Sequence, residues 1–114
     1  MKTIDQLKLT PNQRQGLSSI REKLFGAYEI ETISVFGSIA RGDGDDESDV
    51  DLLIVTRVPL ERTIRHQITD IVFEINLKYD TSFSTLVVDR ASWESGLFSV
   101  LPIREEIIRD AVSI

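Results

Sequence analysis

Two aspartates near the middle of the chain have the type and spacing needed to hold a metal ion. Asp49 and Asp51 are two residues apart at the start of an apolar run, residues 50–55, that predicts a buried strand. Because side chains on a strand alternate between its faces, both carboxylates would point the same way, with Cα atoms about 6.5–7 Å apart. Like charges this close repel each other unless a cation lies between them. Mg²⁺ suits such a pair, since it prefers carboxylate oxygens and takes further ligands from water and phosphates.

A second pattern, upstream of the aspartates, has groups that suit a phosphate. Gly37 follows a short predicted strand, where a glycine permits positive φ and close approach by a ligand. Backbone amides at the start of a helical turn suit an anion, Ser38 adds a hydroxyl, and the guanidinium of Arg41 could form a bidentate contact one turn later. Each pattern alone has an ordinary alternative, because many Gly-Ser turns are only turns and two aspartates can simply cap a strand in an acidic loop.

The elements that would position these residues can be traced along the chain. Thr10, Pro11 and Gln13 predict a capped helix start, and Gly26 is a plausible end of that helix. The expected elements are a helix over 10–26, a strand over 33–36, a helical turn over 38–41, a polar loop over 42–48, a strand over 50–55, a helix opening at Pro59 with an apolar stripe to Ile75, a strand over 83–88, and helices over 90–97 and 103–112. This order predicts a single α/β or α+β domain over residues 1–114, with a small mixed sheet flanked by helices.

Composition narrows the classes of function. The 114 residues include no cysteine and one histidine, which excludes disulfides, thiolate catalysis and cysteine-based zinc sites. A net charge of -6 disfavours general nucleic-acid binding, although metal ions could still bring a nucleotide to an acidic protein. No apolar run approaches a membrane span and the N-terminus lacks the apolar core of a signal peptide. We therefore expect a cytoplasmic protein without a membrane partner.

The two patterns together resemble a known signature. Gly37-Ser38, ten further residues, and then Asp49-Val50-Asp51 are similar to the motif of the DNA polymerase β-like nucleotidyltransferase superfamily. The flanking residues, 40–42 and 48–52, resemble the minimal nucleotidyltransferase (MNT) branch more closely. The resemblance is dense over residues 33–55, and the order of elements extends it loosely to the whole chain.

This resemblance implies a role for each matching position. Gly37 and Ser38 would bind the β- and γ-phosphates of a nucleoside triphosphate, and Asp49 and Asp51 would coordinate Mg²⁺. The reaction would be transfer of a nucleoside monophosphate, with AMP from ATP the expected case, to a hydroxyl group. MNT proteins often resemble antitoxins paired with a helical HEPN protein, which they silence by modifying a tyrosine. A HEPN-type protein is therefore the expected partner.

One departure from the family pattern concerns a third carboxylate. Active members usually carry it on a neighbouring strand, where the corresponding positions of this chain are Ser82 and Ser84. Asp80 shares their strand parity and could substitute if the register slips, whereas Glu74 and Asp89 are weaker candidates.

Three hypotheses follow. The first is an Mg²⁺-dependent nucleotidyltransferase acting on a protein partner, since little chain remains to build a second substrate pocket. The second, motivated by the missing acid, is a binding module that neutralises its partner by association. The third is transfer to a small molecule such as an antibiotic, for which a homodimer would supply the missing wall of the pocket.

Overall fold

A four-stranded mixed sheet forms the centre of the fold in the computed structural model, which describes residues 2–45 and 48–114. Its strands are β1 (Ile30–Phe36), β2 (Val50–Thr56), β3 (Phe83–Asp89) and β4 (Val112–Ser113). They lie in the order β3-β2-β1-β4. β1 runs antiparallel to both β2 and β4, whereas β2 and β3 are parallel. The expectation of an α+β domain with a small mixed sheet is confirmed.

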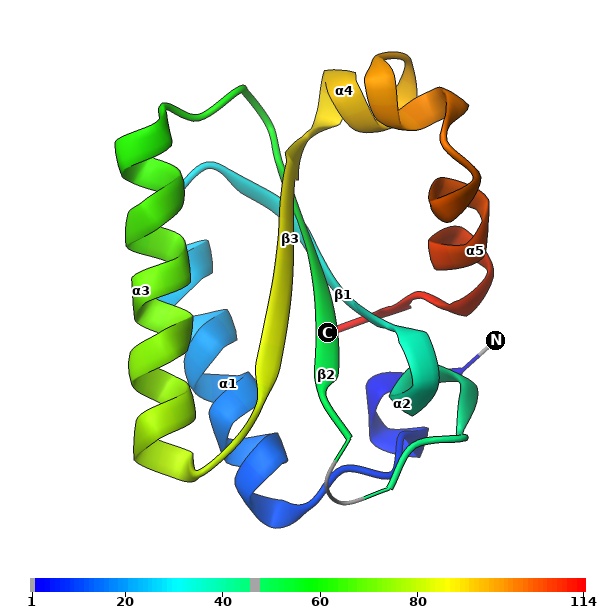
Figure 1. Cartoon of the computed structure of the whole chain (residues 1–114). Helices are drawn as coiled ribbons and strands as arrows, with labels where there is room; N and C mark the ends of the chain where they lie inside the picture. The colour runs from blue at the N-terminus through cyan, green and yellow to red at the C-terminus, as the bar shows by residue number, and fades with distance from the viewer. Residues whose placement is uncertain (1, 46–47) are drawn as a thin grey trace.

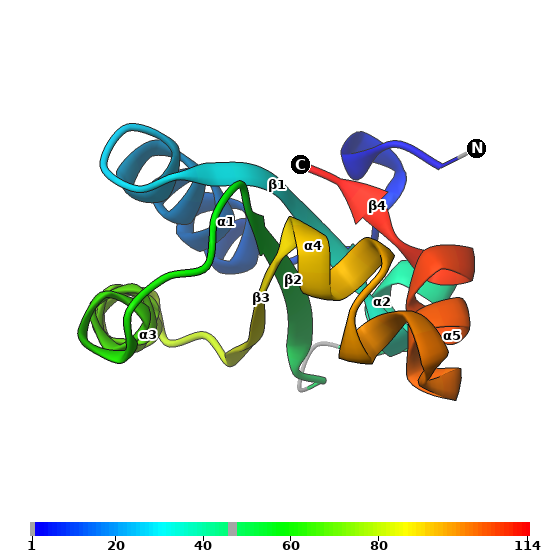
Figure 2. The same ribbon diagram turned by 90° about the horizontal axis from the view of Figure 1, so that it is seen from above.

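Helices cover both faces of this sheet (Figures 1 and 2). The helices are α1 (Pro11–Phe25), α2 (Gly37–Arg41), α3 (Arg62–Tyr79), α4 (Arg90–Glu94) and α5 (Pro102–Asp110), with 3-10 turns η1 (Ile4–Gln6) and η2 (Leu97–Val100). α1 and α3 pack on one face, and α4, η2 and α5 lie on the other. Within the described residues, no helix combines the length and apolar character needed to cross a membrane.

The central strand β2 contributes to two hydrophobic cores, one on each face of the sheet. Val50, Leu52 and Ile54 are buried in the larger core beneath α1 and α3. Leu53 and Val55 point the opposite way, into a smaller core that includes Trp93 of α4 and Ile107 of α5. Side chains alternate along a strand, so a strand buried on both faces reads as a continuous apolar run. This explains why residues 50–55 lack the polar alternation of an exposed strand.

Local capping chemistry places the start of α1 as expected. The Thr10 hydroxyl accepts a hydrogen bond from the Gln13 amide at 3.1 Å, and the Gln13 side chain accepts one from the Thr10 amide at 2.9 Å. This reciprocal pair forms the predicted capping box. Gly26 is the C-cap residue, so the helix ends at Phe25.

Three predicted helix boundaries are wrong. The helix expected over 90–97 ends at Glu94, and Leu97 belongs to the separate turn η2. In the other two cases tertiary packing decides. α3 begins at Arg62 instead of Pro59, because Glu61 is extended and the preceding Leu60 packs against the larger core. The last helix ends at Asp110 instead of residue 112, because Ala111 is extended and Val112 pairs with Val35 at the edge of β1. Val112 is buried in the larger core, and a β-branched residue is well suited to that strand position.

Candidate active site

Asp49 and Asp51 lie on the same face of the sheet, at the start of β2. Asp51 is the second residue of the strand, paired with Phe36 of β1 and Ser84 of β3. Val50 between the two aspartates is fully buried beneath α1 and α3, so both carboxylates lie on the opposite face. Asp51 is half-buried and Asp49 is exposed. The structure therefore brings the two predicted metal ligands together.

The electrostatics of Asp51 fit a bound cation. Burial raises the pKa of the Asp51 carboxyl, the neighbouring charge of Asp49 raises it further, and Arg41 opposes both effects. A divalent ion between the carboxylates would remove this repulsion. No cluster of three acidic, histidine or cysteine side chains placed for a metal occurs within the described parts of the chain. Two carboxylates completed by water and phosphate oxygens are nevertheless a common Mg²⁺ environment, so Asp49 and Asp51 fit this ion.

The Gly37 turn is packed directly against Asp51. Gly37 has φ of 78°, in the left-handed region that side chains disfavour. A β-carbon at this position would collide with Oδ2 of Asp51, so only glycine fits both the backbone conformation and the space. The predicted phosphate-binding turn and the predicted metal ligands are therefore immediate neighbours. Ser38 follows in the first turn of α2, and no hydrogen bond to its hydroxyl is found among the described residues.

Arg41, the third predicted phosphate-binding residue, is held by acidic side chains in this structure. Its guanidinium donates to Asp110 at the end of α5 at 2.9 Å, and Asp43 lies 3.6 Å away. Arg41 also influences the pKa of Asp51, so its charge is close enough to act on the site. The role of Asp110 was missed from sequence, because it depends on α5 folding back against α2. Contact between Arg41 and a phosphate stays a prediction.

Replacing Asp110 by asparagine is expected to tighten ATP binding about threefold. Asp110→Asn would weaken the ion pair that holds Arg41, which leaves the guanidinium free to contact a phosphate. An ion pair with so exposed an arginine is weak because solvent screens it, which limits the effect. The measurement is calorimetric titration with a non-hydrolysable ATP analogue. The control is Glu29→Gln, which removes a charge from a different ion pair, that of Glu29 with Arg57. Weaker binding of the analogue by Asp110→Asn would contradict the prediction.

The parallel register of β2 and β3 shows what occupies the place of a third carboxylate. Ser84 lies level with Asp51, and Ser82 precedes β3 at the level of Asp49. The Ser82 hydroxyl donates to Oδ1 of Asp49 at 2.6 Å. The register does not slip, so Asp80 remains at the end of α3, two residues before Ser82, and is exposed. Hydroxyl groups therefore face the aspartates from β3.

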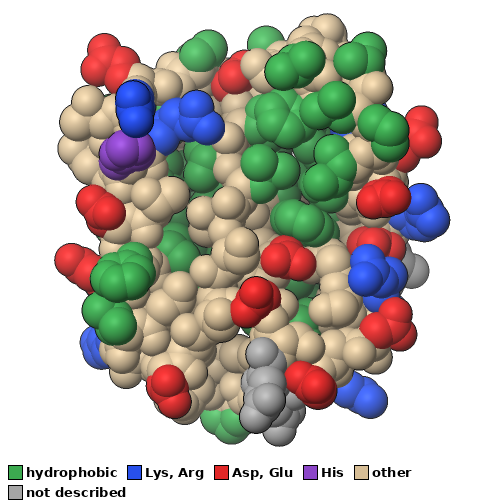
Figure 3. All heavy atoms as spheres, viewed as in Figure 1, with side chains coloured by type: hydrophobic (Ala, Val, Ile, Leu, Met, Phe, Trp, Pro, Cys, Tyr) green, Lys and Arg blue, Asp and Glu red, His purple; other side chains and the backbone are tan. Residues whose placement is uncertain are grey.

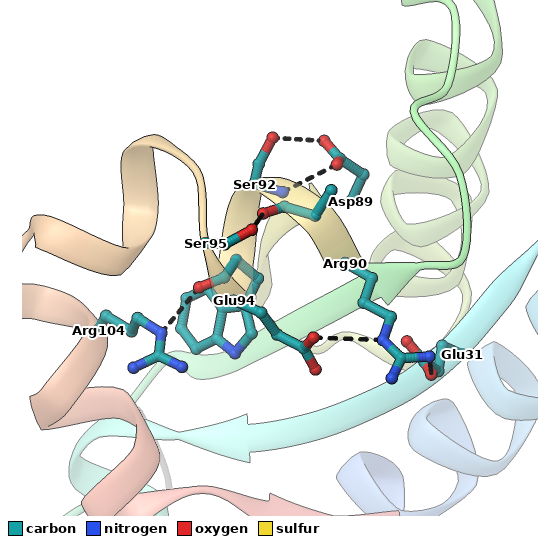
Figure 4. A network of polar contacts seen from close by, with 9 residues as sticks. Glu31, Asp89, Arg90, Ser92, Glu94, Ser95 and Arg104 are labelled. Carbon is teal, nitrogen blue, oxygen red and sulfur yellow. Dashed lines mark hydrogen bonds and ion pairs between the residues drawn. The ribbon is translucent and has the colours of Figure 1, made fainter.

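The other two candidates for a third acid lie away from the site. Glu74 is exposed on α3, the helix that covers the opposite face of the sheet. Asp89 ends β3 at the level of Thr56, about 17 Å along the strands from Ser84. There it caps α4 by accepting hydrogen bonds from the Ser92 amide at 3.0 Å and the Ser92 hydroxyl at 2.8 Å (Figure 4). Asp89 is therefore a structural residue.

Loss of the Asp89 cap is expected to destabilise the fold by about 1 kcal/mol at pH 7, the usual effect of removing an N-cap. The hydrogen bonds from Ser92 lower the pKa of Asp89 in the folded chain. The contribution of its charge is therefore present above the unfolded pKa, about 3.9, and is lost as pH falls through the lower folded value. Urea unfolding of Asp89→Ala at pH 7 and pH 3 should show the difference from wild type shrinking with acid. Asp89→Asn, which keeps the cap acceptor, should lose less; a difference that grows at pH 3 would contradict this account.

Comparison with known proteins identifies the family. The family model of the nucleotidyltransferase domain matches residues 15–109. The chain belongs to the nucleotidyltransferase domain family. The predicted resemblance is thereby confirmed. The Gly37 turn and the two aspartates, Asp49 and Asp51, lie inside the matched region.

Curated relatives come from Methanocaldococcus jannaschii. One, named "Putative protein adenylyltransferase", is 37% identical over 59 residues, which cover 52% of this chain and 60% of the relative. Another with the same description is 34% identical over 78 residues, covering 67% of this chain and 73% of the relative. This nucleotidyltransferase domain thus spans less than two thirds of the first relative's length.

Solved structures share the fold. A "putative minimal nucleotidyltransferase" matches with a TM-score of 0.60 and 18% identity, over 89% of this chain and 91% of that chain. A structure described as "the toxin-antitoxin with AMP-PNP" matches with a TM-score of 0.55 and 15% identity, over 91% of this chain and 72% of that chain. At these identities the similarity establishes the fold alone.

An exposed apolar patch lies on the same side of the sheet as the acidic pair. Figure 3 shows hydrophobic side chains gathered over the region between β3 and α5. The exposed hydrophobic residues of η2 and the start of α5 are Leu97, Val100, Leu101 and Ile103. Trp93 itself is buried, whereas Leu97 is 70% exposed. Contiguous exposed apolar surface of this kind is typical of an interaction surface.

Proposed function

We propose that this nucleotidyltransferase domain is an Mg²⁺-dependent adenylyltransferase that moves AMP from ATP to a hydroxyl of a protein partner. The observation that carries the proposal is the packing of the Gly37 turn against Asp51, with Asp49 on the same face of the sheet. A triphosphate bound by that turn would have its phosphates beside both carboxylates. Mg²⁺, when bound there, would screen the charge of the phosphates and polarise the α-phosphoryl group.

The protein groups contribute by position and charge. The acceptor oxygen attacks the α-phosphorus of ATP, the new O–P bond forms, the bond to the β-phosphate breaks, and pyrophosphate leaves. Gly37 and Ser38 would hold the β- and γ-phosphates, and Arg41 would add a positive charge beside them. The chain supplies little else for the chemistry, since phosphoryl transfer depends mostly on positioning and charge stabilisation. The proton of the acceptor hydroxyl passes to solvent, because Ser84 on β3 and Ser82 just before it stand where a carboxylate base would stand.

Two observations favour a protein acceptor. The apolar patch of η2 and α5 lies on the same side as Asp51 and offers a surface that a folded partner could cover. The descriptions of the relatives include protein adenylyltransferase and toxin-antitoxin. Together with the MNT resemblance, these points support an antitoxin-like domain whose partner is a HEPN-type helical protein.

Label transfer tests the proposed activity. The purified chain would be incubated with α-labelled ATP, Mg²⁺ and the protein encoded beside it. We expect label on the partner, and none when Asp49 and Asp51 are replaced together by alanine. Transfer that is absent with the wild-type chain, or unchanged in the double variant, would overturn the proposal.

A second function is favoured by Ser82 and Ser84, the serines at the start of β3. With hydroxyl groups in place of a third carboxylate, the domain could bind nucleotide yet neutralise its partner by association alone. The test is partner inhibition by the Asp49→Asn/Asp51→Asn double variant. Inhibition that persists along with complex formation would support this function over transfer. Inhibition that disappears while the complex still forms would support catalysis.

A further inference from the structure

Ser82 makes a short hydrogen bond to one of the two proposed metal ligands. Its hydroxyl donates to Oδ1 of Asp49 at 2.6 Å, the length typical of a hydroxyl bonded to an ionised carboxylate. The backbone carbonyl of Ser82 also accepts from the amide of Val50 at 2.9 Å. The same residue therefore holds both the side chain of Asp49 and the backbone that follows it.

Asp49 depends on such support more than Asp51 does. Asp51 lies within β2, between two neighbouring strands, and Gly37 packs against its carboxylate. Asp49 precedes the first residue of β2, is exposed, and follows a polar loop. Its carboxylate would be free to rotate without a partner on β3.

The turn that carries Ser82 is itself anchored to α3 by one side chain. Asn76 accepts from the Phe83 amide at 2.8 Å and from the Thr81 hydroxyl at 3.0 Å. Its amide nitrogen donates to the Phe83 carbonyl at 3.1 Å, so the residues on both sides of Ser82 are fixed. Asn76 thus holds the neighbours of Ser82 on both sides, and the Ser82 hydroxyl in turn holds Asp49.

We propose that Ser82 is a positioning residue that orients the Asp49 carboxylate for a divalent cation. This inference rests on the proposed function, because it assumes that Asp49 and Asp51 bind the metal. The hydrogen bond occupies part of Oδ1 and leaves Oδ2 and the remaining lone pairs for the ion. Orientation before binding reduces the ordering cost of binding, and partners of this kind typically change metal affinity by about 10- to 100-fold.

Mn²⁺ binding to the full chain tests the proposal without measuring catalysis. Bound and free Mn²⁺ can be separated by the electron paramagnetic resonance signal of the free ion, using Mn²⁺ alone as the probe. We expect Ser82→Ala to raise the dissociation constant about tenfold. Ser82→Thr, which keeps the hydroxyl, should restore most of the affinity.

Ser84→Ala is the matched control. Ser84 lies on the same face of β3, two residues further on, and within the described residues its hydroxyl makes no hydrogen bond to either aspartate. We expect its Mn²⁺ affinity and its thermal midpoint to equal those of the wild type. If Ser82→Ala binds Mn²⁺ like the wild type, or if Ser84→Ala weakens binding as much, the positioning role is wrong.

Two further variants separate this proposal from the proposed function. Asp49→Asn and Asp51→Asn should each lose Mn²⁺. If they do and Ser82→Ala does not, the role of Ser82 alone fails. If the wild-type chain takes up no Mn²⁺, or if both aspartate variants bind it normally, the metal site fails and the role of Ser82 with it.

Discussion

Asp51→Asn is expected to lower the rate of AMP transfer about a thousandfold while leaving the fold intact. Asparagine has nearly the same shape as aspartate but lacks the charge that a metal ion requires. Metal-based charge stabilisation contributes several kcal/mol to such reactions, and about 1.4 kcal/mol corresponds to a factor of ten in rate. Measuring kcat/KM with labelled ATP and the partner protein gives the loss directly.

The stability of Asp51→Asn should be equal to or higher than that of the wild type, although its transfer activity falls. Burial and the charge of Asp49 raise the pKa of Asp51 in the folded chain, so its ionised form is disfavoured there. A raised carboxyl pKa means that stability falls as pH rises through the titration range, so ionisation of Asp51 carries a cost in the folded chain. Asparagine removes it, so the thermal midpoint of Asp51→Asn should lie at or above that of the wild type.

Asp70→Asn provides a matched removal of charge for this comparison. Asp70 is exposed on α3, which covers the opposite face of the sheet. It should keep full transfer activity. If Asp51→Asn loses activity together with several degrees of thermal stability, unfolding explains the loss, and Asp51 would no longer be assigned to the metal.

Local chemistry explains why much of the site could be predicted from the sequence. The glycine turn, the apolar run and the two aspartates can each be interpreted from residues that are close in the sequence. Residues 50–55 were predicted as a strand, and the structure has β2 at Val50–Thr56. The contact between Gly37 and Asp51 follows once the strands that carry them pair antiparallel.

The features of the site that could not be predicted from the sequence depend on strand register and on packing between segments far apart in the chain. The family resemblance placed Ser82 and Ser84 beside the aspartates, but the hydrogen bond from Ser82 to Asp49 was not predicted, because β3 is joined to β2 through the whole of α3. Parallel pairing through such a crossover is set by how the helix packs, not by a turn motif. The same reason explains why the pairing of Arg41 with Asp110 and the short strand β4 were missed.

Gly37→Ala is the second variant for which we expect a large effect. The added β-carbon would collide with the Asp51 carboxylate and would sit on a backbone with φ of 78°. Left-handed backbone costs a residue with a side chain about 1–2 kcal/mol, which the fold can tolerate. The collision must be relieved by moving either the turn or the carboxylate, and misplacement of about 1 Å can cost 100-fold in rate. We therefore expect transfer to fall at least about 100-fold, measured as kcat/KM.

Gly42→Ala separates the effect of the collision from that of backbone strain. Gly42 also has positive φ, 84°, at the end of α2. Among the described residues, however, a β-carbon there meets nothing nearer than the Lys2 amine at 3.7 Å, an ordinary contact. Both variants should therefore lose similar stability in urea unfolding, whereas Gly37→Ala alone should lose Mn²⁺ affinity and transfer. Equal losses of transfer in the two variants would mean that strain in α2 is responsible. The close approach of turn and carboxylate, on which the proposed site depends, would then have no role in the reaction.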